Sequence, residues 1–300
     1  MVYYFDMHRT RVFGPMFRKS GVIQRNLYRS SLVRYAMSYP RIYELPSWIF
    51  YPRPKFKKGD DKIIVFDTYS TVRLVNWLCE NWPDKRIIFW YWNPVNNFLI
   101  QEQVPKRVEF WSYSKADCEL HGFRHNTQFF FDCLAAKAEL CRARKARNPV
   151  AKALFLGREK GRARSLQELA GQLEKAGAEV DFRIMQRPEG RFVTIREKLL
   201  PYQAVIDLVM DADVLVDYNQ DPDSGLSLRP LEAMFFGKKL ITNNREILSA
   251  DFYTPANIYV LGHDKRTLRE FVENPGVEVA PEIRDRYLLS NWLRRFDEEV

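Results

Sequence analysis

Short apolar runs alternate with helix-periodic segments along the first half of the chain. The runs that predict buried strands are Lys62–Phe66, Arg86–Trp92, Val108–Trp111 and Phe129–Phe131. Apolar side chains at helical spacing predict helices over residues 71–82, 115–122 and 132–145. Because alternating strands and helices are typical of a parallel sheet covered by helices, this region is predicted to form one α/β lobe.

The same alternation resumes after Asn148-Pro149, a turn signal that predicts a lobe boundary. The strands predicted beyond it cover residues 151–156, 179–185, 214–216, 239–242 and 258–261. The helices predicted there cover residues 164–176, 203–210, 230–236, 265–272 and 281–296. The predicted fold is therefore α/β, with two Rossmann-like parallel-sheet lobes at 59–148 and 149–275 and a C-terminal helix in 276–300.

Residues 1–58 form a basic arm in front of the first predicted lobe. They hold twelve Lys and Arg against Asp6 and Glu44, a net charge of +10, whereas the whole chain carries +9. A helix would place Arg18, Arg25 and Arg29 on one face and Ile23, Leu27 and Met37 on another. We predict a largely helical arm that meets an anionic membrane surface through residues 9–58. A helix packed on the first lobe and a phosphate-binding surface remain the alternatives.

Composition excludes several classes of protein. With 46% hydrophobic and 14% aromatic residues, the chain can bury two cores and is not disordered. No apolar run reaches the roughly eighteen residues that a membrane-spanning helix needs. The N-terminus has Asp6 and His8 where a secretion signal needs an apolar core, so we expect a cytoplasmic protein. The cysteines lack CxxC or zinc spacing and are predicted to be reduced thiols: Cys79, Cys118, Cys133 and Cys141.

The stretch Ala212–Asn244 concentrates the candidate chemistry. It is predicted to form a strand, a polar loop containing Gly225, a helix and a second strand. Pro230 suits the first turn of that helix, and Gly237 suits its end. A strand that leads through a loop into a helix N-terminus is where open α/β sheets bind anions, because free N–H groups and the helix dipole favour negative charge.

Within this stretch, GLSLRPLEAMFFGKKLIT (residues 225–242) resembles the donor-binding segment of two-domain glycosyltransferases with the GT-B fold. The likeness is greatest to bacterial enzymes that build capsule or lipopolysaccharide. The resemblance implies a hexosyltransferase-like enzyme that moves a sugar from a UDP- or GDP-linked donor to a cell-surface glycan or lipid-linked acceptor. It also implies a peripheral position at the inner face of the cell membrane, and neither a metal nor another cofactor.

The resemblance further implies a donor-binding set in the second lobe. Arg158 and Lys160 follow that lobe's first strand, where the family places a Gly-Arg and a lysine against the diphosphate. Glu232 matches the glutamate that holds the ribose, and its two carboxylate oxygens suit two hydroxyl groups. Gly225 allows the backbone to approach the pyrophosphate. The full implied set is Arg158, Lys160, Ser224, Gly225, Leu226, Arg229 and Glu232.

Candidate catalytic residues come from both predicted lobes. In the best-known family motif, a second glutamate precedes the ribose glutamate with seven residues between them, and Ser224 stands at that position here. Asp223 is adjacent and is predicted to present an acid to the sugar. Asp67, at the end of the first lobe's first strand, is the candidate base for the acceptor hydroxyl. Trp92 and Asn93 follow the next strand and are predicted to contact the acceptor.

Two functions of other classes stay open. The chain would be an inactive partner subunit of a transferase if the missing upstream glutamate abolishes catalysis. It would be a nucleic-acid binder if the basic arm contacts phosphates, although the chain has no recognition motif and we expect no nucleic-acid partner.

Overall fold

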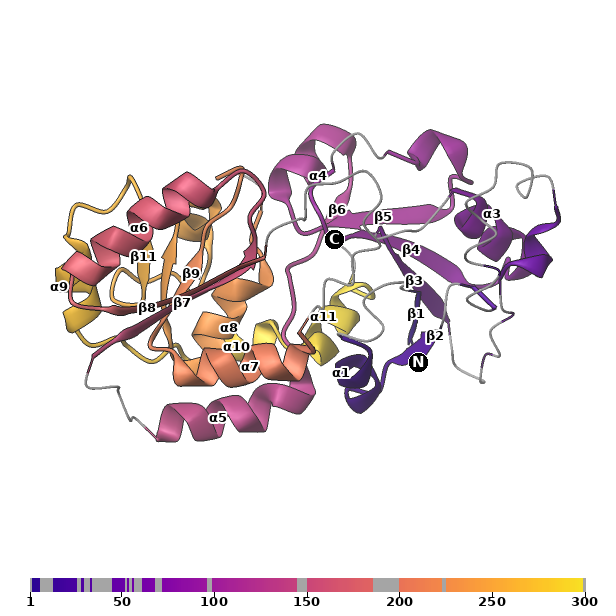
Figure 1. Ribbon diagram of the computed structural model, residues 1–300. Helices are drawn as coiled ribbons and strands as arrows, with labels where there is room; N and C mark the ends of the chain where they lie inside the picture. The colour runs from indigo at the N-terminus through magenta and orange to yellow at the C-terminus, as the bar shows by residue number, and fades with distance from the viewer. Residues whose placement is uncertain are drawn as a thin grey trace. The chain divides into compact units, whose positions relative to one another are not determined.

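The computed structural model describes residues 2–5, 13–25, 28–29, 33, 45–51, 53, 56, 61–67, 72–95, 99–144, 150–185, 200–222 and 225–298. The chain divides into two compact units, each with its own parallel sheet (Figure 1). Unit 1 comprises residues 1–127 with 298–300, and unit 2 comprises residues 128–297. None of the helices in the described ranges has the length and apolar content to cross a bilayer.

Unit 1 contains a parallel sheet with the strand order β2-β1-β3-β4-β5-β6. Its strands are β1 (Val2–Phe5), β2 (Ile23–Arg25), β3 (Lys62–Phe66), β4 (Arg86–Tyr91), β5 (Val108–Ser112) and β6 (Arg124–His125). Its helices are α1 (Gly14–Lys19), α3 (Val72–Asn81) and α4 (Lys115–His121), with 3-10 turns η2 (Ser47–Ile49) and η3 (Gln101–Gln103).

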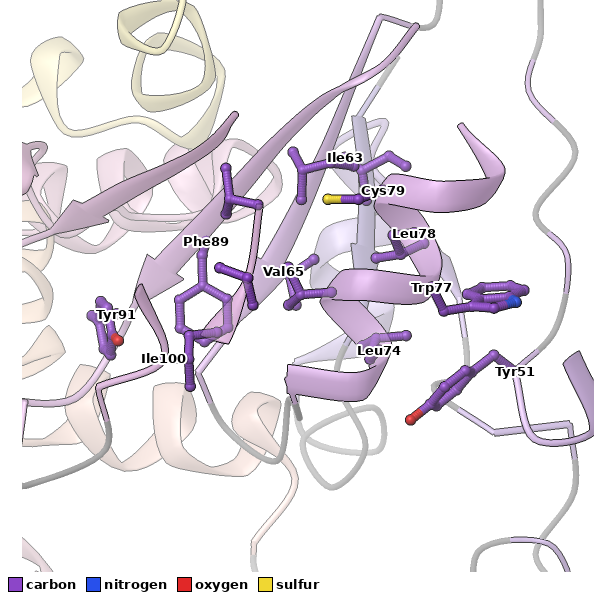
Figure 2. Close-up of a cluster of buried hydrophobic side chains, with 14 of the residues drawn as sticks. Tyr51, Ile63, Val65, Leu74, Trp77, Leu78, Cys79, Phe89, Tyr91 and Ile100 are labelled. Atoms are coloured by element: carbon purple, nitrogen blue, oxygen red, sulfur yellow. The ribbon is translucent and has the colours of Figure 1, made fainter. Parts of the chain in front are cut away.

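The core of unit 1 lies between the central strands and α3. Ile63 and Val65 point from β3 toward Leu74 and Leu78 of α3, and all four side chains are fully buried (Figure 2). The helix forms because its apolar residues recur at a spacing of three and four, which gathers them on the face that meets the sheet. Alternate residues of a strand face opposite sides, so Phe66 points to the other face.

Helix α1 covers that other face. Phe17 of α1 is buried edge-on against Phe66, with ring centroids 6.0 Å apart. Trp92 packs on the same cluster, 5.4 Å from Phe13 and 5.0 Å from Phe66, and is only 5% exposed. The helix that follows β1 therefore contributes to the core on the second face of the sheet of unit 1.

The prediction that residues 1–58 form an arm separate from the first lobe is wrong, because the described part of this range belongs to unit 1 and includes two strands of its sheet. Strand β1 is an interior strand of the sheet of unit 1, pairing with β3 on one side and with the edge strand β2 on the other. Ile23 and Arg25, expected on a helix, belong to β2, whereas Leu27 and Met37 lie outside the described residues. A run of four residues such as Val2–Phe5 is too short to show a periodicity that distinguishes a strand from a helix. The many basic residues that follow it instead favour the prediction of a charged helix.

We expect deletion of residues 1–58 to unfold unit 1 rather than to release a stable lobe. The deletion would expose the edge of β3 and remove Phe17, Phe50 and Tyr51 from the core. Solubility and limited proteolysis of the truncated protein measure this. A truncated protein that melts at the temperature of the full chain would show that the arm is dispensable for folding.

Unit 2 contains a second parallel sheet, with the strand order β11-β10-β9-β7-β8. Its strands are β7 (Lys152–Arg158), β8 (Glu179–Met185), β9 (Val214–Asp217), β10 (Lys239–Thr242) and β11 (Ile258–Val260). Its helices are α5 (Ala135–Ala143), α6 (Ala163–Lys175), α7 (Tyr202–Asp211), α8 (Leu228–Phe236), α9 (Leu268–Glu273), α10 (Pro281–Arg286) and α11 (Leu289–Arg295), with 3-10 turns η4 (Asp132–Leu134) and η5 (Arg245–Ser249).

Helices cover both faces of this sheet. Helices α6 and α9 lie over one face, and α7 and α8 lie over the other, with α5 packed on α8 (Figure 1). Val214 and Val216 of β9 face the α6 side, where they join the core formed with Leu166 and Leu169. The alternate residues Leu215 and Asp217 therefore face α8. The alternation of side chains along β9 therefore buries the Asp217 carboxylate beneath α8.

Three predicted boundaries differ from the observed ones. The units divide after Thr127 rather than after Asn148, because α5 packs on α8 and the Phe130 ring stacks on Phe235 at 4.0 Å. Phe129–Phe131 is not a regular strand and forms only a bridge to Leu288. The predicted C-terminal helix is split into α10 and α11.

Both sheets begin with the same strand order. The first strand of each unit (β1 or β7) pairs with the second (β2 or β8) on one side and with the third (β3 or β9) on the other. The chain therefore reverses direction across the sheet between β1 and β3 in unit 1 and between β7 and β9 in unit 2. Open α/β sheets bind ligands at the carboxyl ends of the strands that flank such a switch point. The predicted α/β fold with two Rossmann-like parallel-sheet lobes is confirmed.

Candidate functional site at the switch point of unit 2

The carboxyl ends of β7 and β9 place two polar loops at the switch point of unit 2. Strand β7 ends at Arg158 and leads through Glu159, Lys160 and Gly161 into α6. Strand β9 ends at Asp217 and leads through a loop into α8. Because β7 and β9 are hydrogen-bonded neighbours, the basic loop and the loop that precedes α8 lie at the same edge of the sheet.

The basic loop turns sharply and exposes its cations. Lys160 has a positive φ of 49°, the only non-glycine case among the described residues, and Gly161 follows at 77°. Glu159 holds this turn, since its carboxylate accepts the Gly161 N–H at 2.9 Å and the Ala163 N–H at 3.0 Å. Those N–H groups lower the pKa of Glu159 because they stabilise its ionised form. The side chains of Arg158 and Lys160 remain exposed at the loop surface.

Arg162 ties the two loops together. Its guanidinium donates to the Arg158 carbonyl at 2.6 Å, to the Glu159 carbonyl at 3.3 Å and to the Tyr218 carbonyl beyond β9. The same group lies over the Phe155 ring, 5.3 Å from its centroid. Because one partly buried cation bonds backbone from both loops, it fixes the spacing between them.

The loop that precedes α8 is anchored by amides and a carboxylate from the segment that follows β10. Asn243 pairs with the backbone of Asn219, accepting its N–H at 2.7 Å and donating to its carbonyl at 2.8 Å. Gly225, buried with a φ of 71°, donates its N–H to Glu246 at 3.2 Å, and its carbonyl accepts from Asn244 at 2.5 Å. A side chain at Gly225 would be strained in this left-handed conformation.

Two buried carboxylates lie beneath the start of α8. Asp217 accepts a hydrogen bond from Ser227 Oγ at 3.0 Å, while Ser227 also caps α8 by accepting the Arg229 N–H at 3.1 Å. Glu232, 2% exposed, accepts from the Tyr202 hydroxyl at 2.8 Å and pairs with the Arg229 guanidinium. The network therefore joins β9, α7 and the first turns of α8.

Burial raises the pKa of the Asp217 carboxyl and, likewise, that of Glu232. Arg229 opposes both shifts by attracting the ionised forms. Burial also raises the pKa of the Tyr202 hydroxyl, and the adjacent Glu232 charge acts in the same direction. Desolvation is thus the dominant electrostatic feature of this network.

We expect Asp217→Asn to become more stable relative to the wild type as the pH rises. A carboxyl with a raised native pKa binds more protons when folded, so its contribution to stability is lost as the pH rises from about 4, the usual value, through the native pKa. The asparagine does not titrate and escapes this loss. Melting temperatures of both proteins between about pH 4 and pH 7 measure the difference. A wild type that instead gains stability relative to Asp217→Asn as the pH rises would show that the native pKa is lowered.

In unit 1, the candidate base Asp67 is held by Asn93. The Asp67 carboxylate accepts the Asn93 backbone N–H at 3.0 Å and the side-chain amide at 3.0 and 3.1 Å. This contact joins the carboxyl ends of β3 and β4. Asp67 therefore lies at the switch point of unit 1, and the structure brings two of the predicted residues together.

Other predicted residues are placed differently. Trp92, predicted to contact an acceptor, is buried against α1, so its ring faces are covered by the chain itself. Asp223 and Ser224 lie outside the described residues. Leu226 lies in the loop before α8, and Arg229 lies in the first turn of that helix.

Sequence reasoning missed Asp217, Tyr202, Arg162 and Asn243. Asp217 and Asn243 each follow an apolar strand, and a polar residue at that point is a usable signal in a parallel sheet. Tyr202 and Arg162 have no such signal, because their partners are distant in the sequence. Among the residues that the structure describes, no group of three or more His, Cys, Asp or Glu is arranged to hold a metal ion.

A cavity of about 830 Å³ lies at the opposite edge of the same sheet, where β7, β9, β10 and β11 begin. Among its lining cations, Lys238 donates to the Met210 carbonyl at 2.8 Å and Arg269 donates to the Lys175 carbonyl at 2.9 Å. The carboxyl edge at β7 and β9 is the better candidate for anion binding, because there an exposed basic loop adjoins the loop that leads into the N-terminus of α8.

No family model and no curated protein matches the chain. One solved structure with a similar arrangement is an alpha-glucosyltransferase in complex with UDP and a 13-mer DNA containing a central A:G mismatch. The two chains share 11% identity over 81% of this chain and 80% of the other, with a TM-score of 0.47. A likeness this slight identifies neither an activity nor a substrate.

Proposed function

We propose that the chain is a GT-B-type glycosyltransferase that uses a nucleotide-activated sugar, with unit 2 as the donor-binding lobe. The observation that carries this is the switch point of unit 2, where an exposed basic loop after β7 adjoins the loop that leads into α8. Cations and a helix N-terminus both favour binding of the negatively charged diphosphate of a nucleotide. The resemblance of residues 225–242 to a donor-binding segment supports the same assignment.

In this proposal, Arg158 and Lys160 contact the diphosphate. Arg158 offers a planar fork of donors and Lys160 a mobile point charge, and both are exposed at the loop surface. Arg162 positions their loop, and α8 directs its N-terminus to the same edge. These cations would stabilise the diphosphate as it leaves, which is the largest contribution that a metal-independent site makes.

The buried position of Glu232 changes its proposed role. A ribose contact would require Tyr202 or Arg229 to give up a carboxylate oxygen, because both oxygens are already bonded and the residue is 2% exposed. We therefore assign Glu232 to positioning Arg229 and the first turns of α8. Arg229, with the backbone of Gly225 and Leu226 and the adjacent Ser224, stays on the donor side.

The reaction is a substitution at the anomeric carbon. An acceptor hydroxyl oxygen bonds to that carbon, the bond from the carbon to the diphosphate oxygen breaks, and its electron pair leaves with the diphosphate. A base takes the hydroxyl proton. Asp67 is our candidate for that base because its carboxylate lies at the carboxyl end of β3, oriented by Asn93. Asp223 is the candidate acid beside the sugar.

The proposed acceptor is a cell-surface glycan or a lipid-linked sugar at the inner face of the membrane, and the proposed donor carries UDP or GDP. The net charge of +10 on residues 1–58 supports a position at an anionic surface. The second candidate function is that of an inactive partner subunit. It is favoured by Glu232, because both of its carboxylate oxygens are already bonded, to Tyr202 and Arg229.

Thermal shift with UDP, GDP, CMP and a short oligonucleotide tests the proposal. We expect one nucleotide diphosphate to stabilise the wild type and not the variant with Arg158→Ala and Lys160→Ala. Stabilisation by the oligonucleotide alone would contradict a donor site. Release of nucleotide diphosphate from UDP- or GDP-sugars in the presence of crude membranes then separates an active transferase from an inactive subunit.

A further inference from the structure

A tryptophan and a leucine protrude from a rigid turn in unit 1. The Trp48 turn, defined as residues 45–49, contains η2 and leaves Trp48 54% exposed and Leu45 46% exposed. Large apolar side chains of globular proteins are more often buried, so two exposed at one turn are unusual. A tryptophan on a locked backbone is presented at low conformational cost.

The side chain of Arg73, on α3, donates hydrogen bonds to the Trp48 turn. Its guanidinium donates to Ser47 Oγ at 3.0 Å and to the Leu45 carbonyl, and it lies 4.7 Å from the centroid of the Phe50 ring. Both ends of η2 are therefore fastened to α3. The exposure of Trp48 is a consequence of this anchoring and not of a loose end.

The residues that follow the turn are buried in the core. Phe50 is 2% exposed and Tyr51 is fully buried, with its ring 5.3 Å from Trp77 of α3 (Figure 2). Arg29 bonds the same segment, since its N–H donates to the Phe50 carbonyl at 3.0 Å and its Nε to the Tyr51 carbonyl at 3.1 Å. Trp48 is therefore exposed next to a segment, Phe50-Tyr51, that is buried and hydrogen-bonded.

Basic residues outnumber acidic ones in the sequence around the turn, where Glu44 is the one acid between residues 7 and 58. Arg29 and Arg73 are the ionic side chains with described bonds to it or to the residues that follow it, and Arg53 is exposed nearby in the sequence. Residues 1–58 hold twelve basic residues against two acids. Exposed apolar side chains in a segment rich in Lys and Arg match the interface of an anionic bilayer, where indole rings and basic residues both lie at the headgroups.

We propose that the Trp48 turn inserts into the headgroup region of an anionic membrane and anchors unit 1 there. Nucleic acid is the weaker occupant, because Leu45 offers it neither a charge nor an aromatic face. The proposal deepens the membrane position given under the proposed function but does not depend on sugar transfer. The membrane contact and the nucleotide site lie in different units and are measured separately.

Sedimentation with vesicles of phosphatidylglycerol and phosphatidylcholine tests the proposal. We expect the full chain to bind these vesicles, to bind phosphatidylcholine vesicles weakly, and to lose about tenfold in partitioning with Trp48→Ala. Trp48→Phe should retain most of the binding. Leu120→Ala is the matched control, because Leu120 is 77% exposed in unit 1 but lies beside the acidic Glu119.

The melting temperature and the nucleotide-induced shift of Trp48→Ala report whether folding or the donor site has changed, and we expect neither to change. Vesicle binding by Trp48→Ala equal to the wild type would overturn the proposal. So would Trp48-dependent binding of a DNA duplex without vesicle binding, or a dimer that Trp48→Ala converts to a monomer.

Discussion

Replacing both Arg158 and Lys160 by alanine is expected to weaken nucleotide-diphosphate binding about 100-fold or more, since each charge-assisted hydrogen bond contributes about 1.5–3 kcal/mol. Both side chains are exposed on the loop after β7, so their loss should leave the fold unchanged. Titration calorimetry with UDP and GDP measures the affinity, and circular dichroism checks the fold.

Arg164→Ala is the matched control for this loss of charge. Arg164 lies in the first turn of α6, and its side chain is 93% exposed and pairs only with Glu168 among the described residues. The substitution Arg164→Ala therefore changes the net charge near the site without removing a residue of the β7 loop. Nucleotide affinity should stay within about twofold of the wild type, because exposed ion pairs contribute little. Equal losses in both variants would mean that general charge, not the loop, attracts the nucleotide.

Glu232→Ala is expected to destabilise unit 2 by about 3–5 kcal/mol, because it leaves the Arg229 guanidinium in a buried site without its partner. The Tyr202 hydroxyl loses its acceptor as well. For a unit of this size the melting temperature should fall by roughly 10 °C. Differential scanning calorimetry in the absence of nucleotide measures the change.

Two further variants separate positioning from direct ribose contact. Glu232→Gln keeps the shape and should cost less stability, and Tyr202→Phe removes one hydrogen bond, at about 1 kcal/mol. If Glu232 only positions α8, nucleotide affinity should follow the stability of each variant. A Glu232→Gln protein that melts like the wild type but does not bind nucleotide would instead establish a direct ribose contact.

The strands of both sheets could be predicted from sequence wherever apolar residues form an uninterrupted run. Lys62–Phe66 and Lys239–Thr242 are observed at their predicted bounds, because strands buried on both faces contain continuous apolar runs, here Ile63–Phe66 and Leu240-Ile241. Strand β1 could not be predicted in this way. Its four residues are too few for periodicity, and the charges that follow it dominate the composition.

The candidate site could be predicted only in part. The position of Arg158 and Lys160 follows from the strand that precedes them, since a residue at the carboxyl end of a parallel strand reaches the ligand edge. The burial of Glu232 could not be foreseen, because Tyr202 lies 30 residues away and no local pattern links the two. Trp92 illustrates the same limit, as its cover comes from α1, a helix far earlier in the chain.

Hydrogen–deuterium exchange of the full chain, with and without UDP or GDP, tests most directly whether the switch point of unit 2 binds the nucleotide. We expect slower exchange at residues 158–162 and 218–227 and little change in unit 1. Slower exchange at the opposite edge of the sheet, around residues 237–240 and 273–279 that line the cavity, or no change with either nucleotide, would contradict a donor site between β7 and β9.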